Sequence, residues 1–191
     1  MPDITRGRRA EPALVFQIGD LAKLHRELGI PADYAASRGL TYQAEPDGIL
    51  VTIAVREGRE IQLTASAASA WQKMMSAAAR DRISLVPLSG FRSIQRQAEI
   101  ICAKRTAGQA IPDILKVNAA PGFSEHHTGR ALDVGAPGSP PFEEVFAQTP
   151  AFQWLIANAA AFGFSLSYPK NNPHGFSYEP WHWLCRQAEP A

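Results

Sequence analysis

Residues 124–134 read Ser124-Glu125-His126-His127-Thr128-Gly129-Arg130-Ala131-Leu132-Asp133-Val134. A histidine and an aspartate stand seven positions apart in this stretch, with a glycine between them. Residues 130–135 read as a strand, on which Leu132 and Val134 point to one side and Asp133 to the other. A carboxylate flanked by two apolar residues is poorly solvated unless it has a partner. The stretch therefore predicts a strand with a core face and a polar, site-forming face.

A second stretch, Glu179-Pro180-Trp181-His182-Trp183, supplies another carboxylate and another histidine near the C-terminus. A hydrolytic zinc site uses three protein ligands and keeps one position open for water, and imidazole and carboxylate groups both bind zinc. We therefore predict that His126, Asp133 and His182 hold one Zn²⁺ ion. Glu179 is then the carboxylate that takes a proton from the zinc-bound water and delivers it to the leaving amine.

Each of these residues also has a simpler interpretation. His127 adjoins His126 and is an alternative ligand, Asp133 could cap a turn, and Glu179 could be a surface charge. Their occurrence together in one short chain favours the metal site. On an extended segment, residues three positions apart face opposite ways, so Glu179 and His182 require a kink between them, which Pro180 favours.

Composition sets limits on the class of protein. The 191 residues carry a net charge of +1, which predicts one domain and gives no reason to expect nucleic acid or an anionic membrane as a partner. No run of eighteen apolar residues occurs, so no membrane-spanning helix is expected. We expect a cytoplasmic protein if Met1 is the native start, and a periplasmic or cell-envelope protein if a leader has been removed. Cys102 and Cys185 are predicted to be reduced.

Hydrophobic spacing and turn residues predict an α+β fold with a small, mainly antiparallel sheet and helices packed on one side. Residues 107–123 are rich in Gly, Pro and Ala and are expected to form a long functional loop. The other expected elements are helices at 18–28, 64–81, 94–106, 142–147 and 151–162, a hairpin from 49–55 and 60–63, and strands at 83–88, 164–168 and 176–183.

The motifs also carry a family resemblance. Ser124, His126, Gly129, Ala131 and Asp133 meet the pattern Ser-x-His-x-x-Gly-x-Ala-x-Asp, and residues 179–182 follow as Glu-Pro-Trp-His. Residues 89–93, Ser-Gly-Phe-Arg-Ser, resemble a Ser-Gly-Tyr-Arg-Ser segment of the same family, with Phe91 in place of tyrosine. In this order the motifs resemble the VanY-type D-alanyl-D-alanine carboxypeptidases, zinc peptidases of the group that includes the hedgehog signalling domain. The match covers roughly residues 85–184.

The resemblance implies a role for each matching residue. It implies the same three zinc ligands, Glu179 as general base, and Arg92 as the partner of the substrate's terminal carboxylate or developing oxyanion. Gln97 and Ser124 would complete the carboxylate pocket. An arginine suits that task because its planar guanidinium fits a carboxylate with two hydrogen bonds. The implied peptidase domain spans residues 63–191, and residues 1–62 are predicted to form an N-terminal arm and a small accessory region.

The implied function is removal of a C-terminal D-amino acid, D-alanine, from peptidoglycan stem peptides or muropeptides, with D,D or L,D specificity. Two enzymatic alternatives are a peptidoglycan endopeptidase and a D,D-dipeptidase, and a site for a free carboxylate argues against the endopeptidase. A third alternative is a zinc-containing binding module without turnover, as in hedgehog proteins, and Glu179 argues against it. The sequence carries no prediction of oligomeric state.

Overall fold

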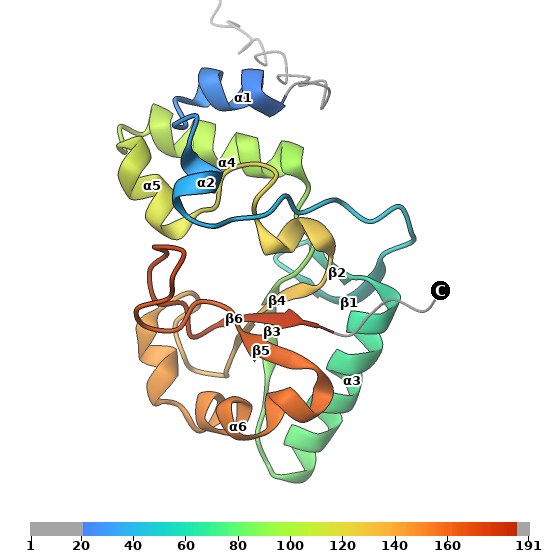
Figure 1. Cartoon of the computed structure of the whole chain (residues 1–191). Helices are drawn as coiled ribbons and strands as arrows, with labels where there is room; N and C mark the ends of the chain where they lie inside the picture. Colours follow the sequence, from blue (N-terminus) through green and yellow to red (C-terminus); the bar gives the residue numbers. More distant parts are fainter. Residues whose placement is uncertain (1–20, 187–191) are drawn as a thin grey trace, which may run out of the picture.

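Strand β4, Ala131–Gly135, is an inner strand of a four-stranded antiparallel sheet in the computed structural model, which describes residues 21–186 (Figure 1). The strand order is β3-β4-β6-β5, with β3 at Val86–Ser89, β6 at His182–Cys185 and β5 at Phe164–Leu166. All five residues of β4 are buried. The structure confirms the predicted α+β class and the predicted strand after Arg130.

One face of the sheet packs on helices α3, Ala65–Arg80, and α6, Pro150–Asn158, together with the 3-10 turns η3, Glu144–Gln148, and η4, Ala159–Phe162. Leu132 and Val134 enter this core, as the alternation in the sequence predicted. They meet the large apolar side chains of α3 and α6, among them Trp71, Met74 and Leu155. This packing leaves Asp133 directed to the other face.

A second group of helices lies on the other side of the sheet and has its own core (Figure 1). The group consists of α1, Leu21–Leu28, α2, Tyr34–Ser37, α4, Ile94–Thr106, and α5, Ile111–Val117. Because α1 and α2 share this core with α4, part of the predicted accessory region is packed against the predicted peptidase region. The domain boundary itself stays a prediction.

Two expectations were wrong in detail. The predicted loop at 107–123 contains α5, whose Pro112 sits in the first turn, where a missing N–H costs nothing, and whose Ile114 and Leu115 are buried. The last strand begins at His182 rather than at residue 176. Residues 176–181 precede it as an irregular segment, and the backbone turns so that the His182 N–H donates to the Glu179 carbonyl at 3.1 Å.

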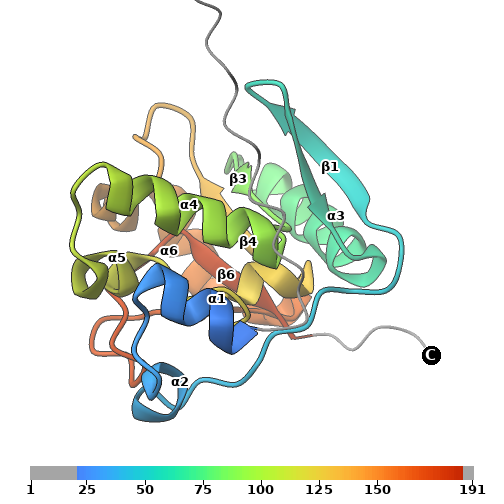
Figure 2. The same cartoon turned by 90° about the horizontal axis from the view of Figure 1, so that it is seen from above.

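The predicted hairpin is confirmed as β1, Val51–Arg56, and β2, Arg59–Leu63, which form a separate two-stranded sheet. Figure 2 shows it standing beside α3. Its two turn residues, Glu57 and Gly58, both have positive φ, 51° and 74°, as the preferred two-residue hairpin turns require.

Three other sequence expectations concern the chain as a whole. Cys102 and Cys185 form no disulfide with each other and lie at different cores. Within residues 21–186, no helix has the length and apolar character needed to cross a membrane. The predicted arm at 1–12 lies outside the described residues.

Candidate active site

Three segments of the chain meet at one point of the sheet. The 3-10 turn η2, Glu125–Thr128, carries His126, β4 carries Asp133, and β6 begins at His182. Asp133 and His182 are direct partners in the β4–β6 ladder. Gly129 ends η2 in the left-handed conformation, at φ 64°, and a Cβ there would lie about 3 Å from the side chains of Leu50 and Thr64. The sequence needs glycine at this position to return from the turn into β4.

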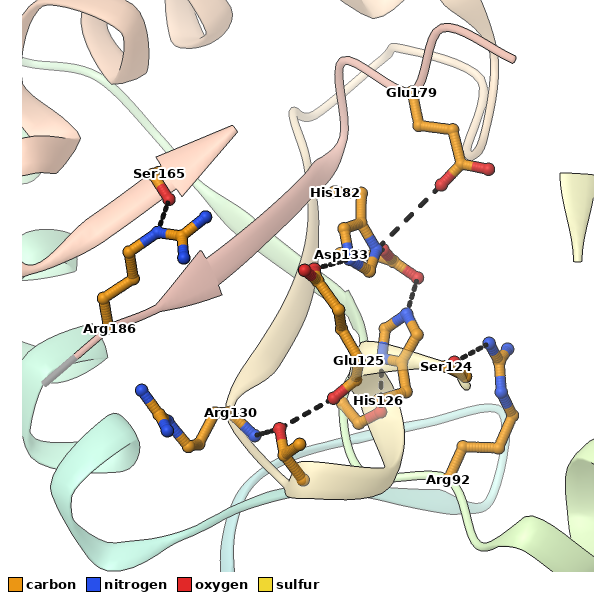
Figure 3. Close-up of polar contacts among 12 residues, drawn as sticks. Arg92, Ser124, Glu125, His126, Arg130, Asp133, Ser165, Glu179, His182 and Arg186 are labelled. Carbon is orange, nitrogen blue, oxygen red and sulfur yellow. Dashed lines mark hydrogen bonds and ion pairs between the residues drawn. The ribbon is translucent and has the colours of Figure 1, made fainter. Parts of the chain in front are cut away.

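The three predicted ligands lie together, with one ligand atom of each within 4.8 Å of the others (Figure 3). His126 Nε2 is 3.2 Å from Asp133 Oδ2, and His182 Nδ1 is 3.0 Å from Asp133 Oδ1. All three side chains are buried. Two imidazoles and one carboxylate make a donor set that suits Zn²⁺ in a hydrolytic site.

The outer hydrogen bonds of the two histidines orient their rings for a metal ion. His126 Nδ1 donates to the Gly90 carbonyl at 2.7 Å, which leaves the Nε2 lone pair on the side of Asp133. His182 Nε2 donates to Glu125 Oε2 at 2.9 Å, which leaves Nδ1 on the same side. Histidines that bind metals use their second nitrogen in this way. The residues present therefore fit a zinc ion.

Sequence reasoning missed the part that Glu125 plays. Glu125 directly precedes a predicted ligand, but its partner, His182, is 57 residues away. Only the pairing of β4 with β6 brings the two together. The sequence shows a carboxylate next to a predicted ligand histidine, but it does not indicate which residue that carboxylate contacts.

The charges at the site favour a cation. Burial by itself lowers the pKa of His182, but the hydrogen bonds to Asp133 and Glu125 outweigh it and raise that pKa to about 10. Burial likewise opposes ionisation of Asp133, yet His126 and His182 hold the pKa of that carboxyl well below its usual range. The site thus surrounds two imidazoles with ionised carboxylates, an arrangement that a bound cation stabilises.

Glu179 lies beside the ligands because of the turn at Pro180. The kink that the sequence predicted between Glu179 and His182 takes the form of this turn. It places Glu179 Oε2 4.0 Å from His182 Nδ1 (Figure 3). The Glu179 N–H donates to the Tyr168 carbonyl at 3.0 Å, and the Tyr168 ring stacks on His182 with centroids 4.8 Å apart. Burial raises the pKa of Glu179 to about 7, although His182 opposes the shift. A general base acts best with its pKa near the working pH.

Arg92 reaches the site from the segment between β3 and α4. Its Nη2 donates to Ser124 Oγ at 3.3 Å, and its backbone N–H donates to the His126 carbonyl at 3.1 Å. Its Nε is buried and has no hydrogen-bond partner within residues 21–186. Burial lowers the pKa of the guanidinium, and the charges of Asp133 and Glu179 oppose that shift. Arg92 therefore offers spare donors to an anion in the site.

His127, the alternative ligand, uses both of its ring nitrogens in hydrogen bonds to the backbone. Its Nδ1 donates to the Arg92 carbonyl at 2.6 Å, and its Nε2 accepts the Gly122 N–H at 3.1 Å. The ring is fully buried, and burial lowers its pKa to about 4. A neutral His127 thus holds the backbone of Arg92 in place and has no nitrogen to offer a metal ion.

A cavity of about 410 Å³ opens over these groups. Its polar wall is formed by the ligands, Arg92, Ser124 and Glu179, with Lys104 and Asn118 beyond them. Its aromatic wall is formed by Phe142, Tyr168, Phe176 and Trp181. A cavity of this size with few convergent polar groups suits a small substrate or the end of a larger one.

Three other polar residues, Gln97, His25 and His174, do not line this cavity. Gln97, predicted to touch the substrate, is fully buried and donates from Nε2 to the Ala119 carbonyl at 2.6 Å, so it supports the wall that Ala119 forms. His25 and His174 bond to the carbonyls of Pro121 and Arg38. They are ordinary structural histidines.

Comparison with known proteins places the chain in a family. The sequence model of the VanY family, described as D-alanyl-D-alanine carboxypeptidase, matches residues 60–186. YodJ of Bacillus subtilis (strain 168) is 31% identical over 175 residues, which cover 85% of this chain and 58% of YodJ. The D-alanyl-D-alanine carboxypeptidase of Enterococcus faecalis (strain ATCC 700802 / V583) is 33% identical over 130 residues, which cover 63% of this chain and 47% of that protein.

Solved structures share the fold. The LdcB LD-carboxypeptidase superposes with a TM-score of 0.60 at 30% identity, covering 81% of this chain and 68% of LdcB. The D,D-pentapeptidase VanY of a VanB-type resistance cassette, solved in complex with Zn(II), gives a TM-score of 0.57 at 26% identity, covering 78% of this chain and 87% of VanY. The chain spans about half the length of the two curated relatives. With its motifs, its fold and two thirds of its length matched, the chain belongs to the VanY family of D-alanyl-D-alanine carboxypeptidases.

Proposed function

We propose that this protein is a zinc-dependent carboxypeptidase that removes the C-terminal D-amino acid, D-alanine, from peptidoglycan stem peptides. The observation that carries the proposal is the meeting of three ligand atoms with Glu179 and Arg92 in one cavity. A D,D-pentapeptidase of the same fold was solved with Zn(II), and LdcB is an LD-carboxypeptidase, which supports both the metal and the class of reaction.

The residues divide the reaction between them. His126, Asp133 and His182 would hold the zinc ion, which when bound would supply Lewis acidity and lower the pKa of water toward neutrality. Glu179, beside the ligands and with its pKa near neutrality, would accept the proton that water loses as it adds to the scissile carbonyl. The same carboxyl group then gives that proton to the departing amine, so that one amide bond is replaced by a carboxylate and a free D-amino acid.

Arg92 recognises the C-terminal end of the substrate peptide. Its guanidinium, held by Ser124 through Nη2, lines the cavity and presents donors that fit the terminal carboxylate of the substrate. The backbone of Arg92 is fixed by His126 and His127, so the guanidinium is held in place before the substrate arrives. Gln97 contributes to this pocket through the wall at Ala119.

Mass spectrometry of defined muropeptides tests the proposal. The substrates are a pentapeptide that ends in D-Ala-D-Ala, a tetrapeptide with a single terminal D-alanine, and a cross-linked dimer. We expect one D-alanine to be lost from the pentapeptide, the tetrapeptide or both, and we expect a chelator to stop the loss. Cleavage confined to the dimer indicates an endopeptidase, release of a D,D-dipeptide indicates a dipeptidase, and zinc binding without any cleavage indicates a binding module.

A further inference from the structure

A second cavity, of about 610 Å³, adjoins the first. Three residues line both cavities, Ser89, Arg92 and Phe142. The guanidinium of Arg92 belongs to the first, because it donates to Ser124, which lines the first cavity only. The junction between the two cavities is therefore marked by Ser89 and Phe142.

The direction of a bound peptide follows from the charges in the first cavity. Lys104 and Asn118 line only that cavity, and Lys104 Nζ donates to Asn118 Oδ1 at 2.5 Å. Arg92 and Lys104 are the two cationic side chains among the arginines and lysines of this wall, and the terminal carboxylate of a substrate is best bound beside them, next to the metal ligands. The peptide that precedes the scissile bond must then leave by another way, and Ser89 and Phe142 mark the way into the second cavity.

The second cavity has an excess of positive charge. Arg56 and Arg59 of the hairpin and Arg96 of α4 line it, against the two carboxylates of Glu57 and Glu60. Arg56 and Arg59 are direct partners across the β1–β2 ladder. Like charges directly opposite each other destabilise a hairpin. A ligand that carries an anion relieves this repulsion.

The existing ion pairs in this cavity are weak. Arg56 Nε lies 3.6 Å from Glu57 Oε1, and Arg96 Nη1 lies 2.9 Å from Glu99 Oε2, with the side chains of both glutamates strongly exposed. Exposed pairs of this kind contribute little to stability. The guanidiniums can therefore exchange these partners for a carboxylate of the substrate at small cost.

Phe142 stands at the junction in a conformation that bulky residues avoid. Its φ is 60°, its side chain is 48% exposed, and its ring meets that of Trp181 edge-on with centroids 6.3 Å apart. Positive φ in such a residue is strained, and strain of this kind collects where ligands are held. Here it keeps an apolar ring in the open between the two cavities.

We propose that the second cavity binds the peptide on the N-terminal side of the scissile bond, and that Arg56, Arg59 and Arg96 bind a side-chain or α-carboxylate on that part of it. Phe142 packs against the peptide where it passes between the cavities. The inference rests on the proposed function and extends it to the substrate's upstream half. It also gives the hairpin a place in recognition.

A pair of peptides tests the proposal. Both end in the same D-amino acids, and they differ only in an upstream carboxylate that one of them carries as a carboxamide. We expect the wild-type protein to prefer the acidic peptide by about tenfold in kcat/KM, the effect of one charge-assisted hydrogen bond. The double variant Arg56→Gln/Arg59→Gln should lose this preference through a higher KM, with kcat and the rate on the amide peptide unchanged. Arg80→Gln, at the exposed end of α3, is the matched control and should behave as wild type.

Calorimetry separates this inference from the proposed function. The ligand is the shortened peptide that lacks the terminal D-amino acid, in its acid and amide forms. Tighter binding of the acid form by the wild type than by the double variant supports the second cavity even if neither full-length peptide is cut. The inference is overturned if the wild type hydrolyses the acidic and amide peptides at equal rates and also binds their two shortened forms equally. That result leaves the proposed function standing. Binding of inorganic pyrophosphate in place of the acidic peptide overturns the assignment to a carboxylate.

Discussion

Glu125 Oε2 lies 2.9 Å from His182 Nε2, and this contact joins the two motifs of the chain behind the metal ligands (Figure 3). The carboxylate can only accept, so the imidazole donates from Nε2, and Nδ1 is the nitrogen that faces Asp133 and that can bind a metal ion once it loses its proton. A ligand histidine fixed by a carboxylate in this way is more basic and better oriented than a free one.

Replacement of Glu125 should therefore weaken zinc binding. We expect Glu125→Ala to lower zinc affinity by about 10- to 100-fold and Glu125→Gln, which keeps an acceptor, to lower it less. Competition with a chromogenic chelator measures the affinity without recourse to activity. Glu99→Gln, an exposed change on α4, is the control. Equal affinity of Glu125→Ala and wild type would show that this contact does not act on the metal site.

Glu179→Ala should abolish hydrolysis and leave zinc in place. Glu179 Oε2 is 4.0 Å from His182 Nδ1 and is not one of the three convergent ligands, so its loss removes a proton carrier and not a ligand. General-base catalysis contributes about 10²- to 10⁴-fold, and a fall of that size in kcat is expected. Zinc content and kcat measured on the same preparation decide the matter, and retention of the full rate contradicts the assigned mechanism.

Arg92→Lys should raise KM by a much larger factor than the factor by which it lowers zinc affinity. Lysine keeps a positive charge but loses the planar fork that fits a carboxylate with two bonds. We expect kcat/KM to fall by at least about tenfold on a peptide with a free C-terminus. The same peptide with a C-terminal amide should be a poor substrate of both proteins, and the variant should show no further loss on it. An equal loss on both peptides assigns Arg92 to the oxyanion.

Zinc affinity should increase with pH. In the folded, metal-free protein the pKa of His182 is raised from 6.5 to about 10, because the Asp133 and Glu125 carboxylates outweigh burial. The stabilisation from the protonated ring is therefore complete below pH 6.5 and is lost as pH rises toward 10. Zinc needs Nδ1 without its proton, so proton release accompanies binding between these limits. Calorimetry in buffers of different ionisation enthalpy counts the protons, and binding without release contradicts the expectation.

The meeting of His126, Asp133 and His182 could be predicted from the sequence because each sits in a motif that fixes its local geometry, and their role as metal ligands stays a prediction. Gly129 permits the left-handed turn after His126, Leu132 and Val134 fix the face of Asp133, and Pro180 forces the turn before His182. Glu125 and His127 could not be assigned in the same way. Their partners, His182 and the Arg92 carbonyl, are 57 and 35 residues away, and only the packed fold brings them close.

The misses in the fold have a similar origin. Helix α5 has too few residues to show a clear period, and it is stabilised by burial of Ile114 and Leu115 against α1, α2 and α4. The stretch 176–181 looks like a strand from its aromatic residues, but Asn172 bonds to both backbone groups of Phe176 and holds the stretch as a loop. The role of Gln97 in the pocket stays a prediction, and its hydrogen bond to the Ala119 carbonyl depends on the packing of α4, which the sequence does not show.

The most direct test of the account is the zinc content of the purified chain after equilibrium dialysis, measured by elemental analysis for the wild type and for His126→Ala and His182→Ala. We expect about one zinc ion per wild-type chain and almost none in either variant, because each ligand supplies a third of the protein donors. A full complement of zinc in both variants would contradict it, since the ion would then be held somewhere other than between the two motifs.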